Sequence, residues 1–485
     1  MKPINVFSSG LVFSPDSRRV IVRPFISSDV TSVLHILERA FALSEEAMEA
    51  QFALLCAGFS SRHADLESAW RRHFALVQHH VGERAISEIR KLYIGALFSG
   101  EYAIESAALF NPSMVPHPDQ TGVEPGALRF VMSLRATGEG HISSIEFRSG
   151  LLDSDGSIDV DEVSRLVVAP EVVRNPTYLK HVFVDKLNEM GFQNPWATQV
   201  MDSLGNTFTH EELGRSLGDL SAGEGSREVD RTRECIDWLA RSNYEIHFPA
   251  SVPLSQRIIF PVSANESNGI EDARFVRFCD DDGSVCYYAT YTAFNGHAIL
   301  PQFIETKDFL SFRVRTLNGR AVQNKGMALF PRKIDGKFAM ISRQDDENLF
   351  LMLSDNLHFW SEPQLLMQPE NPWEFVKIGN CGSPIETEHG WLVITHGVGP
   401  MRRYCIGAML LDLTNPGTVL ARLALPLIEP SDEEREGYVP NVVYSCGSLL
   451  HGRRLLLPYA LSDSRSTIGW VDLDELLNAL TSRVE

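Results

Sequence analysis

Apolar residues recur at helical spacing in the first part of the chain. From about residue 29 to residue 109, residues such as Val33, Leu37 and Ala40 follow one another at intervals of three or four positions, which places them on one face of a helix. Ser44, followed by two glutamates, is typical of a helix start with acids in its first turn. This pattern predicts roughly four consecutive helices.

The pattern changes to short strands after about residue 110. LRFVMSL, SSIEFRS, CYYATYTAF, GWLVITHG and YCIGAMLLDL are short and rich in β-branched and aromatic residues, as strands are. Tight-turn signals such as DG and HG separate many of these segments. A second helical pattern at about 177–245 interrupts the strands and indicates an insertion.

The strand-rich part also repeats loosely, with a strand, a tight hairpin and a further strand in each unit. The spacing is roughly fifty to sixty residues, and about five units can be counted. We therefore expect a mainly β fold, a five-bladed β-propeller over 105–485. It would carry an N-terminal α-helical extension at 1–104 and a helical insertion at about 165–250. A propeller gathers polar loop residues from every blade at one end of its axis.

The net charge of the chain indicates which classes of binding partner to expect. The 485 residues carry a formal net charge of −19, with 44% hydrophobic and 22% charged residues. Proteins that bind nucleic acid or acidic membrane surfaces normally present a basic face, so we expect neither partner. The charge suits a neutral substrate, and a few converging cations would still suffice for a local anion site.

The seven cysteines are scattered, and no CxxC pair or His/Cys spacing typical of zinc occurs. We therefore expect no metal site and no cofactor. The N-terminal segment MKPINVFSSGLVF is too short and too polar for a signal peptide, and no apolar run approaches twenty residues. A cytoplasmic location is the resulting expectation.

Several motifs together carry a resemblance to a known family. They are GIEDARF, NKGMALFPRKIDGKFAMISR, GNCGSPIETEHGWLVITHGV, YCIGAMLLDLTNP and PNVVYSCG. In this order, over roughly 105–160 and 250–480, the chain resembles glycoside hydrolase family 130. The resemblance implies a five-bladed propeller that acts on β-mannosides, mostly β-1,2 or β-1,4 linked. Most members are inverting phosphorylases that use inorganic phosphate and release mannose 1-phosphate, and a minority are inverting hydrolases.

The resemblance assigns the general acid to Asp272, in GIEDAR, where members of the family usually have EDPR. This residue is thought to protonate the glycosidic oxygen through a sugar hydroxyl. A carboxyl group in a partly dehydrated pocket can keep its proton near neutral pH. Ala273 replaces the usual proline, which loosens a backbone constraint and removes no chemical group. On the residues alone, Asp272 and Arg274 would be a surface ion pair at a strand start.

A phosphorylase also has to hold phosphate opposite the leaving group, which calls for cations and amide donors. The phosphate-binding residues of the family map onto either Asn324 or Lys325, and onto Arg343, His396 and Tyr404. The choice between Asn324 and Lys325 stays open. On its own, His396 would be a hydrogen-bonded residue at the end of a strand.

The resemblance places the contacts to the sugar on neutral and charged groups that form hydrogen bonds. These residues are Asn111, Arg135, Glu271, Arg274 and Asp463. On the residues alone, Asp463 fits an Asx-turn between two strands equally well.

Three functions remain open on the sequence. The first is a phosphorylase of oligosaccharides, favoured because the candidate phosphate residues are all present. The second is an inverting β-mannosidase, in which Glu386, Glu436 or Glu139 would activate water. The third is a catalytically silent sugar-binding propeller, which would not be expected to keep Asp272. The helical segments carry no chemical motif, so we expect them to form the interface of a homo-oligomer.

Overall fold

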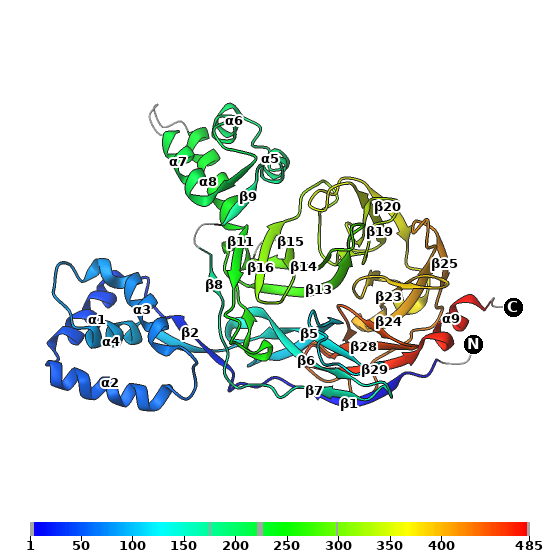
Figure 1. Ribbon diagram of the computed structural model, residues 1–485, viewed down its shortest axis with the longest axis horizontal. Helices are drawn as coiled ribbons and strands as arrows, with labels where there is room; N and C mark the ends of the chain where they lie inside the picture. The colour runs from blue at the N-terminus through cyan, green and yellow to red at the C-terminus, as the bar shows by residue number, and fades with distance from the viewer. Residues whose placement is uncertain (1–3, 174–175, 221–226, 297–298, 483–485) are drawn as a thin grey trace.

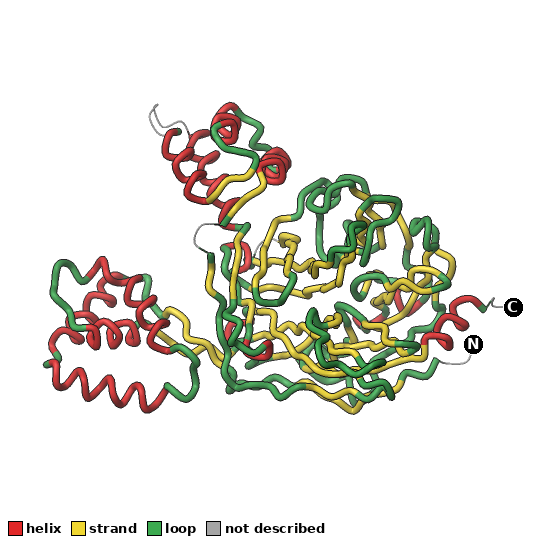
Figure 2. Tube along the Cα trace, in the orientation of Figure 1, coloured by secondary structure: helices red, strands yellow, loops and turns green. Residues whose placement is uncertain are grey.

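The computed structural model describes residues 4–173, 176–220, 227–296 and 299–482. The protein is mainly built from β-strands, which confirms the predicted class. Figures 1 and 2 show a large body of sheets with two helical lobes that project from it. One lobe is formed by helices from the first hundred residues of the sequence, and the other by helices from the middle of the chain.

The N-terminal lobe owes its helices to capping and to one shared core. Asp29, Ser44, Asp65 and Ser87 each accept a hydrogen bond from a backbone N–H of the first turn of the helix that follows. The first, third and fourth helices share a core that includes Val33, Leu37, Phe74 and Ile94. The helices are α1 (Val30–Ala42), α2 (Glu45–Phe59), α3 (Leu66–Val77) and α4 (Glu88–Leu97).

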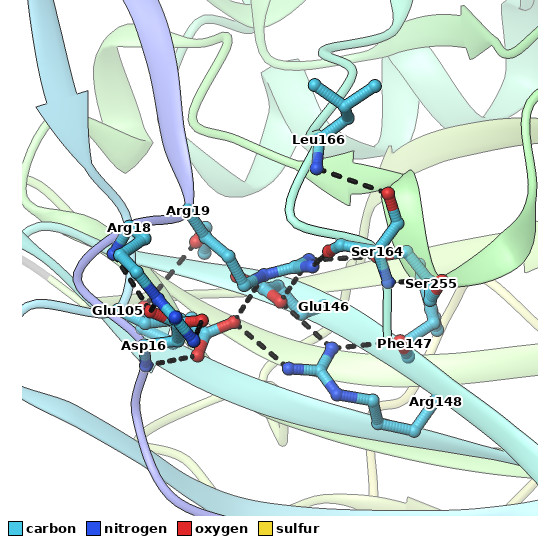
Figure 3. A network of polar contacts seen from close by, with 12 residues as sticks. Asp16, Arg18, Arg19, Glu105, Glu146, Phe147, Arg148, Ser164, Leu166 and Ser255 are labelled. Carbon is cyan, nitrogen blue, oxygen red and sulfur yellow. Dashed lines mark hydrogen bonds and ion pairs between the residues drawn. The ribbon is translucent and has the colours of Figure 1, made fainter. Parts of the chain in front are cut away.

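A two-stranded antiparallel ribbon joins this lobe to the body (Figure 1). It consists of β2 (Val20–Pro24) and β3 (Ser99–Ala103). At its base, Arg19 and Arg148 each form ion pairs with both Glu105 and Glu146, at 2.7 to 3.0 Å (Figure 3). All four side chains are buried, and among the described residues they form ion pairs only with one another, so this network fixes the ribbon to the body.

The body consists of five successive groups of antiparallel strands. The first two groups are joined into one larger sheet through a parallel contact between Gly269 and Ser143. The first group contains β4 (Ala108–Pro116), β5 (Leu128–Thr137), β6 (Ser143–Leu152) and β7 (Ile158–Val160). The second contains β13 (Gly269–Cys279), β14 (Val285–Phe294), β15 (Ile299–Thr306) and β16 (Ser311–Thr316).

The remaining three groups follow in sequence order. The third contains β17 (Ala328–Leu329), β18 (Phe338–Ser342), β19 (Leu349–Ser354) and β20 (Pro363–Met367). The fourth contains β21 (Lys377–Asn380), β22 (Ile385–Thr387), β23 (Gly390–Val398), β24 (Tyr404–Leu411) and β25 (Val419–Arg422). The fifth contains β26 (Val443–Tyr444), β27 (Leu449–His451), β28 (Arg454–Leu461) and β29 (Arg465–Asp472).

The fifth group is completed by the N-terminal strand β1 (Phe7–Phe13), which pairs with β29. Phe7 lies opposite Trp470, and their rings stack at 4.3 Å between centroids. The two ends of the chain therefore meet in one sheet, close to the C-terminal helix α9 (Leu473–Thr481) (Figure 1).

Neighbouring groups share hydrophobic cores in a cyclic order, from the first group to the fifth and back to the first. This packing follows from strands whose side chains are buried on both faces. Contact or shared-core pairs across successive boundaries are Phe147 with Phe275, Phe278 with Phe338, Phe330 with Trp391, Leu410 with Leu455, and Leu456 with Met132.

The second helical lobe interrupts the chain between the first two groups and has its own core around Phe183, Phe208 and Ile236. Strand β11 (Tyr244–His247) pairs with β16, so the chain leaves this lobe as an added strand of the second group. The other elements are α5 (Lys180–Glu189), α6 (Pro195–Asp202), α7 (His210–Asp219), α8 (Arg227–Arg241), β8 (Glu171–Val172), β9 (Thr177–Leu179), β10 (Thr207–Thr209) and β12 (Ile258–Ile259). No helix within the described residues is long and apolar enough to cross a membrane.

Candidate active site

The first strands of four groups bring polar side chains into contact with one another. Nδ2 of Asn111, on β4, donates to Oδ1 of Asp272, on β13, at 2.6 Å. Nη2 of Arg274 donates to the hydroxyl of Tyr444, on β26, at 2.6 Å. On β21, the backbone carbonyl of Asn380 lies 3.1 Å from a ring nitrogen of His396. The ring of His396 in turn packs against that of Tyr444, so polar residues from four of the strand groups lie close together.

Two irregular strands aim the residues of the first pair. The β4–β5 register shifts between Phe110 and Ser113, and the β13–β14 register shifts between Glu271 and Arg274. Asn111 and Asp272 lie in these irregularities in the left-handed region, with φ of 51° and 55°. Asn and Asp tolerate this region best after glycine, and such bends re-aim a side chain.

The left-handed region recurs at two other candidate positions. Asn324 has φ 62° and Asp463 has φ 50°. Sparsely populated backbone conformations of this kind cluster at functional sites, where the surrounding structure holds them.

Asp272 is buried, with 7% of the residue exposed, so it is not half of a surface ion pair. Burial alone would raise its pKa, but Arg135, Lys325 and Arg274, with the Asn111 hydrogen bond, lower the pKa to about 2. Asp272 is therefore ionised in this structure. The expectation that burial keeps this carboxyl group protonated is wrong here, because it did not include the cations that the fold brings to it.

Arg135 links the two acids of the GIEDAR motif. Its Nη2 lies 2.7 Å from Oε1 of Glu271, and its Nη1 lies 3.3 Å from Oδ1 of Asp272. The guanidinium also lies over the ring of Phe110. Lys325 adds a second cation, 3.8 Å from Glu271. These residues form one cluster of alternating charge.

Asp463 belongs to the same cluster but titrates differently. Burial and the nearby charge of Asp272 raise its pKa to about 6, although Arg135, Arg402 and Lys325 oppose this shift. The site thus contains two carboxyl groups whose environments displace their pKa values in opposite directions. Such pairs are a common basis for acid–base chemistry at one pH.

Arg343 and His396 form a second cluster, and both are buried. Nη1 of Arg343 lies 3.3 Å from Nε2 of His396. The Asn380 carbonyl beside Nδ1 only accepts, so Nδ1 carries the proton and Nε2 accepts from Arg343. Burial, Arg343 and Arg274 hold the pKa of His396 well below its ordinary value. His396 is therefore a neutral hydrogen-bond acceptor.

Two tyrosines pack around this imidazole. The ring of Tyr404 lies 6.0 Å from that of His396 at an angle of 17°, and the ring of Tyr444 lies edge-on at 4.8 Å. Arg343, His396 and Tyr404 thus meet, as the sequence predicted. Tyr444 was not predicted, although it lies in the quoted motif PNVVYSCG. Through Arg274 it connects this cluster with the strand of Asp272.

A fourth carboxyl group of the site lies beside the second cluster. Oδ1 of Asp346 is 3.1 Å from Nη2 of Arg343, and its Oδ2 is 2.7 Å from Nζ of Lys377. The pKa of Asp346 is lowered: burial opposes the shift, but Lys377, Arg343 and a hydrogen bond from Asn324 outweigh it. Asn324 and Lys325 therefore face different acids, Asp346 and Glu271 respectively. Nothing in the acidic run RQDDEN distinguished Asp346 beforehand.

Several buried polar atoms of the site have no hydrogen-bond partner among the described residues. They are Oδ1 of Asn111 and the Nε atoms of Arg135, Arg274 and Arg343. Buried polar groups are nearly always paired, so such atoms indicate where a polar ligand binds. A small pocket adjoins Arg274 and Lys325.

The carboxylates expected to activate water lie elsewhere or are engaged. Glu386 forms a two-point ion pair with Arg332, and both side chains are substantially exposed. Glu139 and Glu436 are also exposed. Within the described residues, no group of three or more His, Cys, Asp or Glu side chains is arranged to hold a metal ion.

Two carboxyl groups of divergent pKa beside unpaired guanidinium donors are typical of enzymes that cleave glycosidic bonds. Comparison with known sequences gives the family. Residues 229–482 match the family model described as beta-1,4-mannooligosaccharide phosphorylase, so the chain belongs to glycoside hydrolase family 130.

Individual relatives agree with this assignment. The chain is 32% identical over 232 residues to the 1,2-beta-oligomannan phosphorylase of Thermoanaerobacter sp. (strain X514), which covers 45% of this chain and 75% of that protein. It is 30% identical over 249 residues to a beta-1,2-mannobiose phosphorylase of Listeria innocua, which covers 50% of this chain and 68% of that protein.

A solved structure of the Listeria innocua beta-1,2-mannobiose phosphorylase with beta-1,2-mannobiose has a TM-score of 0.46 and 19% identity, covering 78% of this chain and 93% of that chain.

Proposed function

We propose that the enzyme cleaves β-1,2- or β-1,4-linked manno-oligosaccharides by inverting phosphorolysis and releases mannose 1-phosphate. The family and the names of the relatives support phosphorolysis of β-mannosides. The observation that carries the proposal is the buried guanidinium of Arg343, whose Nε has no hydrogen-bond partner among the described residues and whose Nη1 faces His396. A guanidinium with an unused N–H group fits an oxyanion, whereas hydrolysis by water needs no such group.

In the proposed reaction an oxygen of hydrogen phosphate forms a bond to the anomeric carbon. The bond from that carbon to the glycosidic oxygen breaks, and its electron pair stays on the leaving oxygen, which takes up a proton. The phosphate loses the proton that it brought, so protons balance overall. Attack from the face opposite the leaving group converts a β-mannoside to α-mannose 1-phosphate.

Asp272 is proposed as the acid that passes the proton to the leaving oxygen through a sugar hydroxyl. In the free enzyme its pKa is about 2, so it must gain its proton during the cycle. Phosphate adds negative charge beside the site, and the sugar excludes water from it; both changes raise the pKa of a carboxyl group. Asp463, with a pKa of about 6, is a nearby group from which a proton can be shared.

The other site residues are proposed to hold the two substrates. Asn111, Arg135, Glu271, Arg274 and Asp463 would bind hydroxyl groups of the cleaved mannosyl unit, and the unpartnered atoms of Asn111, Arg135 and Arg274 support this role. Arg343, His396 and Tyr404 would bind phosphate. Of the two adjacent candidates, Lys325 contacts the acids on the sugar side, and Asn324 contacts the acid beside Arg343.

Two proposals concern architecture. The five strand groups are proposed to be the blades of a five-bladed propeller, which is supported by their cyclic shared cores and by the pairing of β1 with β29. The helical lobes are proposed to form the interface of a homo-oligomer. Exposed apolar side chains on the N-terminal lobe, including Phe25 at 78% and Leu54 at 67%, support this second proposal.

Hydrolysis is the second candidate, and one observation favours it. Asp346 places a carboxylate against Arg343, where it would serve as a base for water if phosphate never entered. Incubation with β-1,2- and β-1,4-mannobiose, each with and without phosphate, separates the two. Phosphorolysis predicts mannose 1-phosphate only in the tubes with phosphate. Free mannose at equal rates in all tubes, with no sugar phosphate, would overturn the proposal.

A further inference from the structure

The contact between Arg343 and Asp346 uses only part of the guanidinium. A carboxylate that engages an arginine side-on bonds to Nε and Nη2 together, as Asp16 does with Arg18 and Glu386 does with Arg332. Asp346 approaches Arg343 most closely at Nη2, at 3.1 Å, and forms no hydrogen bond with Nε. Nε on the same edge is buried and has no partner among the described residues.

The two sides of this contact differ in their freedom to move. The side chain of Arg343 is 6% exposed, and that of Asp346 is 49% exposed. The loop that carries Asp346 is held by its neighbour Asp345, whose Oδ1 accepts from the backbone N–H groups of Glu347 and Asn348. Asp346 can therefore turn into solvent by side-chain rotation without rebuilding the loop.

Asp346 also occupies the nearest lysine. Its Oδ2 lies 2.7 Å from Nζ of Lys377, so one carboxylate holds two cations that face the same region. An oxyanion placed on this edge of Arg343 could hydrogen-bond to Nε and Nη2 together, whereas Asp346 leaves Nε without a hydrogen bond. It would also repel the carboxylate at this distance.

We propose that Asp346 is a built-in competitor of phosphate: it pairs with Arg343 and Lys377 in the free enzyme, and phosphate displaces it to reach both cations. Asp346 thereby sets the phosphate affinity of the site without contacting the sugar. This inference rests on the proposed phosphorolysis. It adds a residue that tunes the concentration range of phosphate in which the enzyme works.

The test is calorimetric titration of the full-length enzyme with inorganic phosphate. Asp346→Asn removes the charge and keeps a residue that tolerates φ of 63°. Asp346→Gly also removes any hydrogen bond to Arg343. Glu347→Gln is the matched control, since it removes the same charge one residue further along an exposed loop. We expect both Asp346 variants to bind phosphate about three- to tenfold more tightly, and the control to match wild type.

Kinetics give a second readout. The KM for phosphate should fall by the same factor in the Asp346 variants, while the KM for the mannoside and kcat stay unchanged. If wild type binds phosphate and both Asp346 variants bind it with the same or a lower affinity, this inference alone is overturned. If wild type binds no phosphate and releases free mannose, and Asp346→Asn abolishes that release, then the proposed function fails as well and Asp346 is a base.

Discussion

Asp272 raises the pKa of Asp463, yet its own pKa is displaced in the opposite direction. The pKa of Asp272 is lowered to about 2 because the cations around it outweigh its burial, and that of Asp463 is raised to about 6 by burial and by Asp272. Near neutral pH the site of the free enzyme therefore holds one ionised carboxylate and one carboxyl group close to its titration point. This difference makes the pH behaviour of the protein testable.

Replacement of Asp463 by Asn should stabilise the protein at neutral pH. A buried carboxyl group with a pKa of about 6, above its ordinary 3.8, binds more protons when folded than when unfolded. Its contribution to stability therefore falls as the pH rises from about 4 to about 6. Asp463→Asn does not lose this contribution. Its free energy of unfolding should therefore exceed that of wild type by on the order of 2–3 kcal/mol at pH 7, and by almost nothing at pH 4.

Urea unfolding of both proteins at several pH values between 4 and 8 measures this difference. Asp412→Asn is a control of opposite sign, because hydrogen bonds from Thr414 and Asn415 lower the pKa of Asp412. That variant should lose stability at neutral pH. A difference between Asp463→Asn and wild type that does not change with pH would contradict the raised pKa.

Replacement of Asp272 by Asn should abolish phosphorolysis, with a fall of about 10²–10⁴-fold in turnover, the range for a general acid. Phosphate binding should persist, because Asp272 contacts Asn111 and Arg135, whereas Arg343 contacts His396. The ionised form of Asp272 stabilises the fold above its ordinary pKa, and this contribution is lost as the pH falls toward 2. The variant is therefore less stable at neutral pH, so circular dichroism must accompany the assay. Asp280→Asn is the control, because Asp280 lies just beyond the other end of β13. If Asp272→Asn keeps turnover within tenfold of wild type, Asp272 is not part of the mechanism.

Replacement of Arg343 by Lys should impair the use of phosphate specifically. Lysine keeps the charge but lacks the planar fork that presents two parallel N–H groups to one oxyanion. We expect kcat/KM for phosphate to fall about 100-fold, with the affinity for the mannoside unchanged. Arg332→Lys, which alters a two-point ion pair on the surface, should behave as wild type. Equal losses for both substrates would indicate that Arg343 supports the whole site rather than phosphate.

The local features of the fold could be predicted, and one long-range strand pairing could not. Periodicity and β-branched content indicated strands such as LRFVMSL, which is part of β5, and hence the mainly β class. The strand Phe7–Phe13 gave no such signal, because its partner β29 lies at the other end of the sequence. Pairing at that separation depends on the assembled core and not on local propensity.

The site was predictable where motifs carry it. The structure brings Arg343, His396 and Tyr404 together, which their motif positions had indicated. The protonation of Asp272 was mistaken, because pKa depends on charges such as Arg135 that are distant in sequence. Asp346 and Tyr444 escaped notice because an acid in a loop and a tyrosine on a strand have no distinctive local pattern.

Replacement of Arg19 by Met should destabilise the protein strongly. Arg19 is buried between Glu105 and Glu146, and its loss leaves Arg148 as their remaining cationic partner (Figure 3). Removing one partner of a buried ionic group costs about 3–5 kcal/mol. The neighbouring Arg18→Met is a matched control, since Arg18 is exposed and pairs with Asp16. Similar denaturation midpoints for the two variants would show that the network contributes little.

The identity and anomeric form of the first product, observed by NMR, distinguish inverting phosphorolysis from hydrolysis. Wild-type enzyme is mixed with β-1,2-mannobiose and phosphate, and proton and phosphorus spectra are recorded before the product equilibrates. Inverting phosphorolysis predicts α-mannose 1-phosphate and free mannose in equal amounts, with no turnover when phosphate is left out. Free mannose as the sole product, formed at the same rate without phosphate, would contradict it.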